Sequence, residues 1–303
     1  MKTLFSKGGD LMATGNLNNR LFKGIITAAF VPVCLMSILP MWIIIVASFT
    51  KDKAISDYGY RLWPAIFSLD AYRYLISKPG LVLRAYLVSI TVTVTGTIIG
   101  LILMSMLSYT ISRRGFKPGK WMGFYVFFTM LFNGGVVPYY ILITKHLHLK
   151  NNILVLVLPL LISPFYVMLL RTYFRNLPVM LFEAAKLDGA GEMRMFFIIA
   201  LPLSLPAMAT IALFSMLTYW NDMYQALLFI DNQNLYPLQY LLYKLIYNAG
   251  IIQEGAQYTG TITPYQSIRM AMAVLAIAPV LFSFAFIQKY FIRGITLGGL
   301  KGD

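Results

Sequence analysis

The chain has 303 residues, of which 59% are hydrophobic and only 12% are charged, and its formal net charge is +14. Soluble globular domains carry roughly 25% charged residues, so this composition excludes an ordinary soluble domain and indicates a surface that faces lipid. The Lys and Arg residues are spread between apolar stretches instead of forming one helical stripe or arm, which excludes a nucleic-acid-binding protein.

Residues 1–23 form a polar N-terminal segment, and the apolar stretch after them is too long for the core of a cleavable signal. Residues 24–303 are predicted to form one transmembrane domain. Six apolar stretches are long enough to cross a bilayer: 24–50, 86–109, 121–144, 152–174, 201–230 and 269–292. Because open strand edges cannot be satisfied in lipid, each crossing is expected to be a helix. The sequence therefore predicts an all-α, polytopic membrane protein with six transmembrane helices.

The positions of Lys and Arg predict the orientation of these helices. The larger share lies before the first stretch, after the last, and in the segments 110–120 and 175–200. Segments rich in Lys and Arg stay in the cytoplasm. Both termini are therefore predicted to be cytoplasmic, and the loops 51–85, 145–151 and 231–268 are predicted to lie outside.

The third stretch contains Asn133-Gly134-Gly135 followed by Pro138. Two glycines and a proline in a crossing indicate either a break in the helix or a close approach of a neighbouring helix. These residues could also line a substrate pathway, and close packing is favoured over that role. The nearby pair His146 and His148 could begin a metal site, but no cysteine or acidic residue completes a ligand set, so no metal site is predicted.

The segment between the fourth and fifth stretches is predicted to be a short helix, a sharp turn and a second helix. Gly189 can adopt the left-handed conformation that ends a helix. Ala184 and Ala185 leave a shallow strip on the first helix, where another protein can approach closely. Leu181, Phe182 and Leu187 are predicted to be apolar anchors in a groove of that partner.

An alternative is that this segment lies on the lipid headgroups as an amphipathic connector. A surface helix of that kind favours Lys and Arg on its polar face. This segment instead carries Glu183 and Asp188 beside a single Lys186.

Seven residues of this segment and of the start of the fifth stretch occur at the fixed spacing of a known motif: Glu183, Ala184, Ala185, Gly189, Ile199, Leu201 and Pro202. They match the EAA loop of bacterial ATP-binding-cassette (ABC) importer permeases, and the chain resembles this binding-protein-dependent transport family over nearly its whole length. Trp220-Asn221-Asp222 resembles the MalG-like sugar permeases. The segments 132–138 and 288–302 resemble the LplC/YtcP-type subgroup, in which complex oligosaccharides are common cargo.

The resemblance implies the ABC importer type I permease fold and a heteromeric assembly in the bacterial cytoplasmic membrane. The implied partners are a second permease subunit, two ABC ATPase subunits, an extracellular or periplasmic solute-binding protein and a carbohydrate substrate. The residues expected to couple to the ATPase are Glu183, Ala184, Ala185, Asp188, Gly189, Leu201 and Pro202. The chain has no Gly-x-x-x-x-Gly-Lys-Ser/Thr loop, so we expect it not to be an enzyme and expect ATP and Mg²⁺ to be bound by the partner ATPases.

Asp222 is the only acidic residue within the predicted crossings, and such residues usually face a cavity or a partner. Aromatic rings can cover sugar C–H groups, while amides and carboxylates bond hydroxyls. The candidates for lining a substrate pathway are Asn133, Trp220, Asn221, Asp222, Tyr224 and Gln225. The alternatives, which remain open, are a polar clasp between helices and a position near the headgroups.

The long external loop 231–268 stands where MalG-like subunits reach toward the docked binding protein. By position, its candidates for that contact are Gln253, Glu254, Gln257 and Tyr258.

Three other classes of protein fit this sequence less well. An ion-coupled secondary transporter needs mid-membrane carboxylates and an internal repeat, and the sequence offers one acidic residue and no clear repeat. An ABC permease for a non-sugar solute could share the EAA loop, although the Trp-Asn-Asp run favours sugar. A membrane enzyme would need a nucleophile with its base or a metal set, and neither appears.

Overall fold

The structure is a computed structural model that describes residues 6–77, 79–247 and 265–299. Within these ranges it is helical, and its only β contact is an isolated bridge between Thr50 and Phe67. The chain divides into two compact units. The predicted all-α class is therefore confirmed.

Unit 1 comprises Met1–Arg73 and Thr263–Val274. Its described elements are α1 (Ser6–Ser48), α2 (Asp52–Tyr58), the first residues of α3 (Asp70–Ser77) and the first residues of α15 (Tyr265–Gly299). α1 covers residues 24–48 of the predicted first crossing (24–50) but begins earlier, and Pro32 and Pro40 lie inside it.

The link after α1 folds onto the start of α15. The Phe49 ring stacks on Phe67 and on Tyr72, with ring centroids 5.9 Å and 5.0 Å apart. The Asp52 carboxylate accepts hydrogen bonds from the Ser267 backbone N–H at 2.9 Å and from its hydroxyl at 3.3 Å. A buried carboxylate that is bonded in this way avoids most of the desolvation penalty of an unpaired one.

Unit 2 comprises Tyr74–Ile262 and Leu275–Asp303. Its helical elements after α3 are α4 (Pro79–Ser112), α5 (Gly119–Leu131), α6 (Val136–Ile141), η1 (Leu142–His146), α7 (Leu154–Val157), η2 (Leu158–Leu160), α8 (Pro164–Arg175), α9 (Val179–Leu187), α10 (Glu192–Met195), η3 (Phe196–Ala200), α11 (Leu201–Leu203), α12 (Leu205–Asn221), α13 (Tyr224–Phe229) and η4 (Gln233–Leu235). Residues 238–247 are also helical, and the rest of α15 completes the unit.

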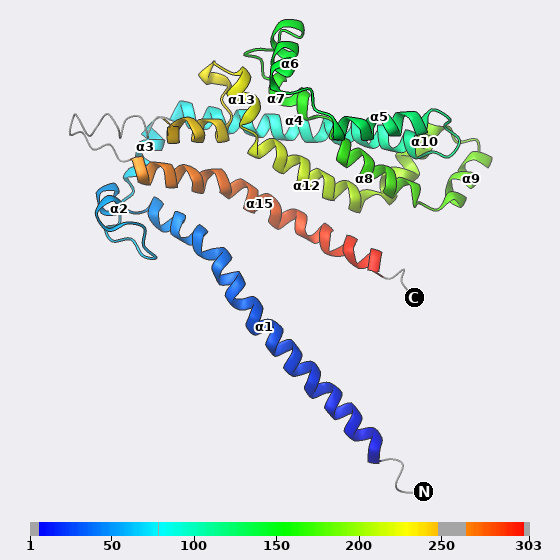
Figure 1. Ribbon diagram of the computed structural model, residues 1–303, viewed down its shortest axis with the longest axis horizontal. Helices are drawn as coiled ribbons and strands as arrows, with labels where there is room; N and C mark the ends of the chain where they lie inside the picture. Colours follow the sequence, from blue (N-terminus) through cyan, green and yellow to red (C-terminus); the bar gives the residue numbers. More distant parts are fainter. Residues whose placement is uncertain (1–5, 78, 248–264, 300–303) are drawn as a thin grey trace. The chain divides into compact units, whose positions relative to one another are not determined.

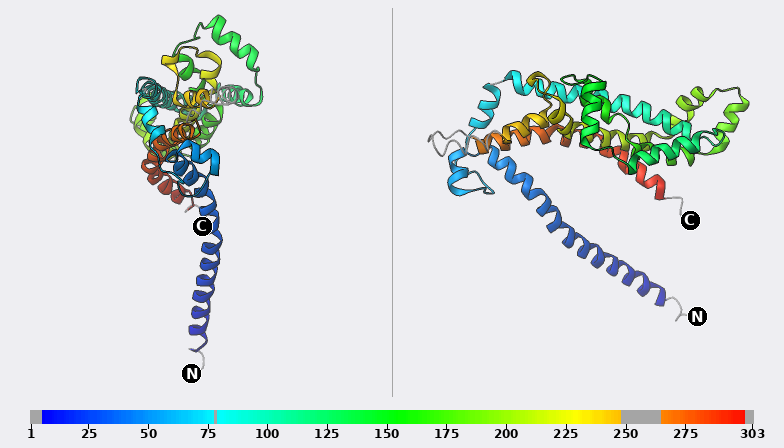
Figure 2. Two further views of the ribbon diagram at one scale, coloured as in Figure 1. Left: turned by 90° about the vertical axis from the view of Figure 1, so that its left-hand side faces the viewer. Right: turned by 45° about the horizontal axis from the view of Figure 1, so that its top comes forward.

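The long helix α4 organises unit 2, because α8 and α12 both pack along it. Figure 1 and the right-hand panel of Figure 2 show it running through the bundle. Near one end, Val88 and Val92 join a buried cluster with α7 and α13. Near the other end, Met104 and Tyr109 join a second cluster with α8 and η3. One unbroken helix therefore connects the two cores of the unit.

Two glycines one turn apart allow these helices to approach α4 closely. A Cβ on Gly96 would overlap the ring of Tyr219 in α12, and a Cβ on Gly100 would lie 2.8 Å from the backbone oxygen of Leu161. Helices in membranes associate through van der Waals packing, and small residues at the contact permit it.

Replacing Gly100 with alanine is therefore expected to destabilise the protein, because a backbone oxygen cannot rotate away as a side chain can. Overpacking of this kind costs about 1–3 kcal/mol. Thermal unfolding of the purified protein in detergent measures the effect. Gly80→Ala in the same helix is the control, because no atom lies within 4 Å of its added Cβ. An equal unfolding temperature for the two variants would contradict this packing.

Three of the predicted crossings are bent. The bends are 112° between α5 and α6–η1, 46° between α7–η2 and α8, and 80° between α10–α11 and α12. Three further helices are long and apolar enough to cross a membrane, which gives up to six crossings if each bent pair is one span. The predicted number of six crossings therefore holds when each bent pair is counted as one crossing.

The sharpest bend follows from local backbone chemistry. Asn133 accepts a hydrogen bond from the Gly135 N–H at 2.9 Å, and Gly135 has a φ of +86°. A side chain is strained in that conformation, so glycine is suited to it. No atom of the described chain lies within 4 Å of a Cβ added to Gly134 or Gly135. The helix-break interpretation is therefore correct, and close packing within this chain is not found.

Candidate functional site

The segment from α9 to α10 has the predicted helix–turn–helix form. Gly189 has a φ of +77°, and its N–H donates to the Lys186 carbonyl at 3.0 Å. The N–H of Ala190 donates to the Ala185 carbonyl at 2.9 Å. This pair of bonds is the Schellman arrangement, which ends a helix sharply and satisfies its last carbonyls.

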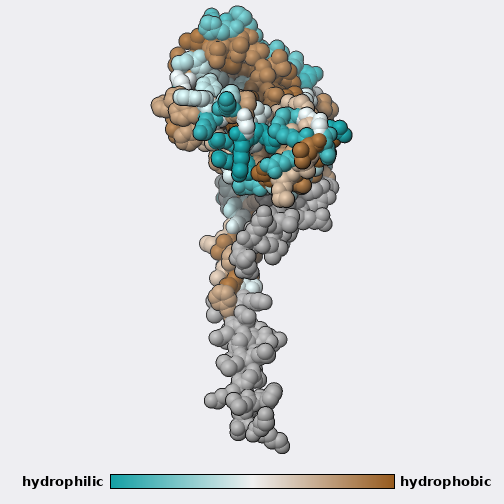
Figure 3. Space-filling view, turned by 90° about the vertical axis from the view of Figure 1, so that its right-hand side faces the viewer, coloured by the Kyte–Doolittle hydropathy of each residue, from teal (hydrophilic) through white to brown (hydrophobic). Residues whose placement is uncertain are grey.

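One face of α9 is exposed and largely apolar. Met180 is 79% exposed and Leu187, seven residues later, is 90% exposed. Glu183 and Ala184 lie between them on the same face and are also exposed. Figure 3 views the end of the unit that carries α9, where hydrophilic and apolar residues lie next to one another. An exposed apolar stripe of this kind marks a surface that another molecule covers.

The opposite face of α9 packs against α4 and α8. Phe182 is only 5% exposed and lies beside Tyr109, with ring centroids 6.4 Å apart. The guanidinium carbon of Arg113 lies 4.6 Å from the centre of the Phe182 ring. The prediction that Phe182 is an anchor for a partner is therefore wrong, because this ring completes the chain's own core.

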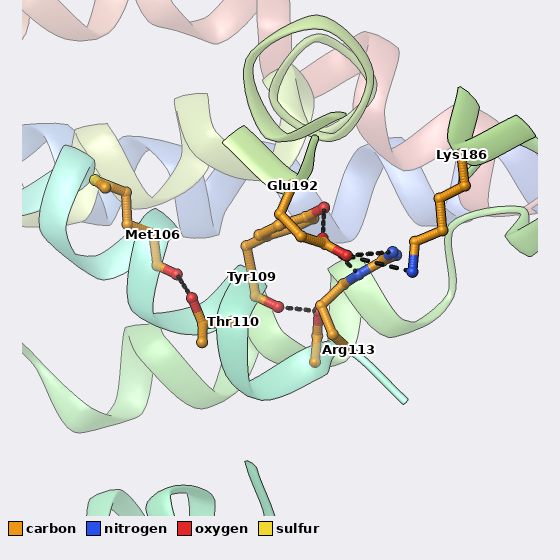
Figure 4. Close-up of polar contacts among 7 residues, drawn as sticks. Met106, Tyr109, Thr110, Arg113, Lys186 and Glu192 are labelled. Carbon is orange, nitrogen blue, oxygen red and sulfur yellow. Dashed lines mark hydrogen bonds and ion pairs between the residues drawn. The ribbon is translucent and has the colours of Figure 1, made fainter. Parts of the chain in front are cut away.

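A carboxylate that the sequence analysis did not single out fastens this segment to α4 (Figure 4). The Tyr109 hydroxyl donates to Glu192 at 3.0 Å, and Arg113 Nε lies 3.2 Å from the same oxygen, Oε2. Lys186 Nζ lies 3.4 Å from the other oxygen, Oε1. We call Tyr109, Arg113, Lys186 and Glu192 the Glu192 cluster. Arg113 and Glu192 lie 79 positions apart in the chain, so only the fold reveals their contact.

The last part of the motif forms the bend into α12. Pro202 lies at the start of the short helix α11, and the chain turns by 80° before α12. Leu201 packs against the second core cluster of the unit. Leu201 therefore holds the base of the segment in place.

Two of the pathway candidates are buried and bonded within the chain. Trp220 is 5% exposed, and its indole N–H donates to the Ala276 carbonyl at 3.0 Å. Gln225 is 6% exposed, and its amide oxygen accepts from the Tyr139 hydroxyl at 2.5 Å. Their polar groups join α12 to α15 and α13 to α6, which is what a polar clasp requires.

The other pathway candidates remain accessible. Asn221 and Asn133 are exposed, and Tyr224 is 43% exposed. Asp222 follows the last residue of α12, and its carboxylate accepts from the Gln225 N–H at 3.3 Å. The break between α12 and α13 thus presents several polar groups on the surface of this chain.

A second junction ties two segments that were both predicted to be external. The Asn151 amide oxygen accepts from the N–H of Asp231 at 2.6 Å and of Asn232 at 3.1 Å. The Lys150 ammonium lies 2.9 Å from the Asp231 carboxylate, and this bond holds the pKa of Asp231 below its ordinary value. The Glu192 cluster likewise joins two segments that were both predicted to be internal. Each contact therefore agrees with the prediction that the two segments it joins lie on the same side of the membrane.

The predicted binding-protein contacts, Gln253, Glu254, Gln257 and Tyr258, lie outside the described residues. In the part of the chain that is described, no three His, Cys, Asp or Glu side chains come together as a metal site.

Comparison with known proteins decides the family. The family described as binding-protein-dependent transport system inner membrane component matches residues 9–297. The chain belongs to this family. It is therefore a multi-pass inner membrane permease component, and the resemblance carried by the EAA loop is confirmed.

Individual relatives refine this placement of the permease. The polygalacturonan/rhamnogalacturonan transport system permease protein YtcP of Bacillus subtilis is 39% identical, over 94% of this chain and all of that protein. Protein LplC of the same organism is 37% identical, over 88% of this chain and 90% of its own length. The similarity to an LplC/YtcP-type subgroup is thereby confirmed.

A solved structure confirms the permease fold. A chain of a bacterial ABC transporter involved in the import of the acidic polysaccharide alginate matches with a TM-score of 0.79 and 27% identity. The match covers 90% of this permease and 98% of that chain. The chain therefore has the fold of an ABC importer permease.

Proposed function

We propose that this permease is a transmembrane subunit of an ABC importer that translocates a carbohydrate, most simply an oligosaccharide, delivered by an extracellular solute-binding protein. Whole-length similarity to permeases that serve polysaccharide-derived cargo supports the carbohydrate. The exposed apolar stripe of α9 is the observation that supports the need for a partner.

The chain itself is proposed to be non-catalytic. Two ABC ATPase subunits would bind ATP and Mg²⁺, and a second permease subunit would complete the membrane pore. The ATPase would receive Glu183, Ala184, Asp188 and Leu187 in a cleft. Ala185 and Gly189 would not contact the ATPase directly. Ala185 is partly buried against the chain itself, and Gly189 forms the turn that ends α9. Both termini, and loops 110–120 and 175–200, would then be cytoplasmic.

The proposed mechanism links the state of the ATPase to the state of the pathway. Closure of the ATPase pair would move α9, and the crossings that meet at the second core cluster would move with it. Transport against a gradient requires such a linked two-state element. Asn133, Asn221, Asp222 and Tyr224 are proposed to face the substrate pathway, while Trp220 and Gln225 hold the helices that present them.

Loop 231–268, with Gln253, Glu254, Gln257 and Tyr258, is proposed to contact the binding protein. The junction at Asn151 supports this assignment, because it fixes the base of that loop to the neighbouring external segment.

Reconstitution of the complete complex in liposomes tests this function. With ATP inside and the binding protein outside, uptake of a labelled oligosaccharide is expected to require both. Oligogalacturonides are the first probe, since polygalacturonan is in the name of a relative that is 39% identical. A neutral oligosaccharide and an amino acid serve as controls for cargo class. Uptake that continues without ATP, or is driven by an ion gradient, would overturn the proposal in favour of a secondary transporter. ATP-driven uptake of the amino acid alone would indicate a non-sugar permease.

A further inference from the structure

Helix α9 has little backbone support of its own. None of the other described helices packs extensively along it, and Figure 1 shows α9 at the end of the bundle, beyond α8 and α10. Cavities of about 240 Å³ and 280 Å³ lie beside it, and both are lined by Tyr109, Arg113 and Lys186. A helix that borders such cavities and has no extensive packing partner among the described helices depends on a few side-chain contacts for its position.

The Glu192 cluster supplies the polar contacts among these. One carboxylate takes donors from two other parts of the chain: Tyr109 lies in the last turn of α4 and Arg113 directly follows that helix, and Lys186 belongs to α9. Glu192 itself begins α10. Three parts of the chain therefore meet at a single side chain, as Figure 4 shows.

The Glu192 cluster contributes little to the stability of the fold. The side chains of Glu192 and Lys186 are 54% and 55% exposed, and exposed ion pairs contribute only about 0–1 kcal/mol to stability. Removing the charge of Glu192 should therefore leave the fold intact. The cluster instead fixes geometry: several charged hydrogen bonds to one carboxylate hold the donor side chains, and the segments that carry them, in a defined orientation.

The element reached by the cluster is the helix that connects both cores of unit 2. From Tyr109, α4 extends past the second core cluster to Val88 and Val92 in the first. Near that far end, Tyr86 lies beside Trp220, with ring centroids 6.4 Å apart. A displacement of α9 that is passed to α4 thus reaches the region of the proposed pathway without passing through the bent crossings.

We propose that Glu192 is a positioning residue that fastens the α9–α10 segment to the end of α4, so that movement of α9 by the ATPase partner is transmitted to α4. This inference rests on the proposed function. Tyr109 and Arg113 are the receiving groups on α4, and Lys186 keeps α9 on the same carboxylate.

The test is the ratio of sugar taken up to ATP hydrolysed by the reconstituted complex. In Glu192→Gln, uptake is expected to fall while ATP hydrolysis continues, lowering the ratio by about 5-fold or more, which is the lower range of measured coupling between sites. Asp70→Asn is the matched control, since it removes an exposed carboxylate 3.8 Å from Arg73 in unit 1. A wild-type ratio in Glu192→Gln would overturn the inference.

Two further variants separate transmission from a merely structural role. Arg113→Gln combined with Glu192→Gln is expected to be no worse than either alone, because both remove the same link; fully additive losses would contradict the inference. Tyr109→Phe keeps the ring packing and removes one hydrogen bond, so a smaller fall in the ratio is expected even if Glu192→Gln assembles poorly. An unchanged ratio in Tyr109→Phe would also count against it.

These outcomes are distinct from failure of the proposed function. If the wild-type complex takes up sugar without ATP, the importer proposal fails. If the wild type is coupled and the Glu192 variants are coupled equally well, only the role of Glu192 fails.

Discussion

Replacing Gly189 with valine is expected to abolish most ATP-driven uptake. The residue has a φ of +77° and makes one of the two bonds that end α9. A left-handed conformation costs an L-residue roughly 1–2 kcal/mol, and a β-branched side chain more. The last turn of α9 must therefore unwind or tilt, which removes the face carrying Ala184 and Leu187 from its partner. Since 1.4 kcal/mol is tenfold in an equilibrium, a loss of about tenfold or more is expected.

Gly191 provides a matched control for this variant. Leaving out the neighbouring residues, no atom lies within 4 Å of a Cβ added at either glycine, so both positions have open space around the added carbon. Gly191 has φ −71° and ψ 162°, an extended conformation that valine adopts readily. Gly191→Val should therefore keep much more uptake than Gly189→Val, and Gly189→Asn should be intermediate because asparagine tolerates the left-handed region. Equal uptake in both valine variants would show that the turn geometry does not matter for coupling.

Replacing Leu187 with aspartate is expected to prevent stable association with the ATPase. The side chain is 90% exposed in this chain, so the change should not disturb the permease itself. At the centre of an interface, however, an unpaired charge costs about 2–5 kcal/mol. Copurification of the ATPase with the tagged permease, followed by quantification of both subunits, measures this loss.

Leu147→Asp is the control for that experiment. Leu147 is 51% exposed and follows η1, in a segment predicted to lie on the other side of the membrane. Its variant should retain the ATPase in full. If Leu187→Asp also retains the ATPase, the stripe of α9 is not the docking surface.

Much of this architecture could be predicted from the sequence because the signals are local. Apolar stretches long enough to cross a bilayer indicate membrane helices whatever their partners are. The glycine after Asp188 indicates a helix end, since its backbone preference does not depend on distant residues. The prediction therefore succeeded for the helix–turn–helix form of the α9–α10 segment and for the number of crossings when each bent pair is counted as one.

Other features depend on which residues meet after folding. Leu181, Phe182 and Leu187 are equally apolar in sequence, and only the rotation of α9 against α4 decides that Phe182 is the buried one. The Glu192 cluster joins residues that are far apart in the chain and so leaves no local pattern. By contrast, the spacing of Gly96 and Gly100 in α4 is a signal that could have predicted the close contact of α4 with α12 and Leu161.

The length of α4 limits how that helix can move. It has 34 residues, which at 1.5 Å per residue is about 50 Å, longer than the hydrocarbon core of a bilayer. Arg84 near its start and Arg113 just past its end are 29 residues apart in the sequence, or about 43 Å, which equals the thickness of a bilayer with its headgroups. Sliding along the membrane normal would draw one guanidinium into the acyl chains at a high energetic cost. Tilting or rotating leaves both at headgroup depth, so a pivoting stroke, and not a piston stroke, is the motion open to this helix.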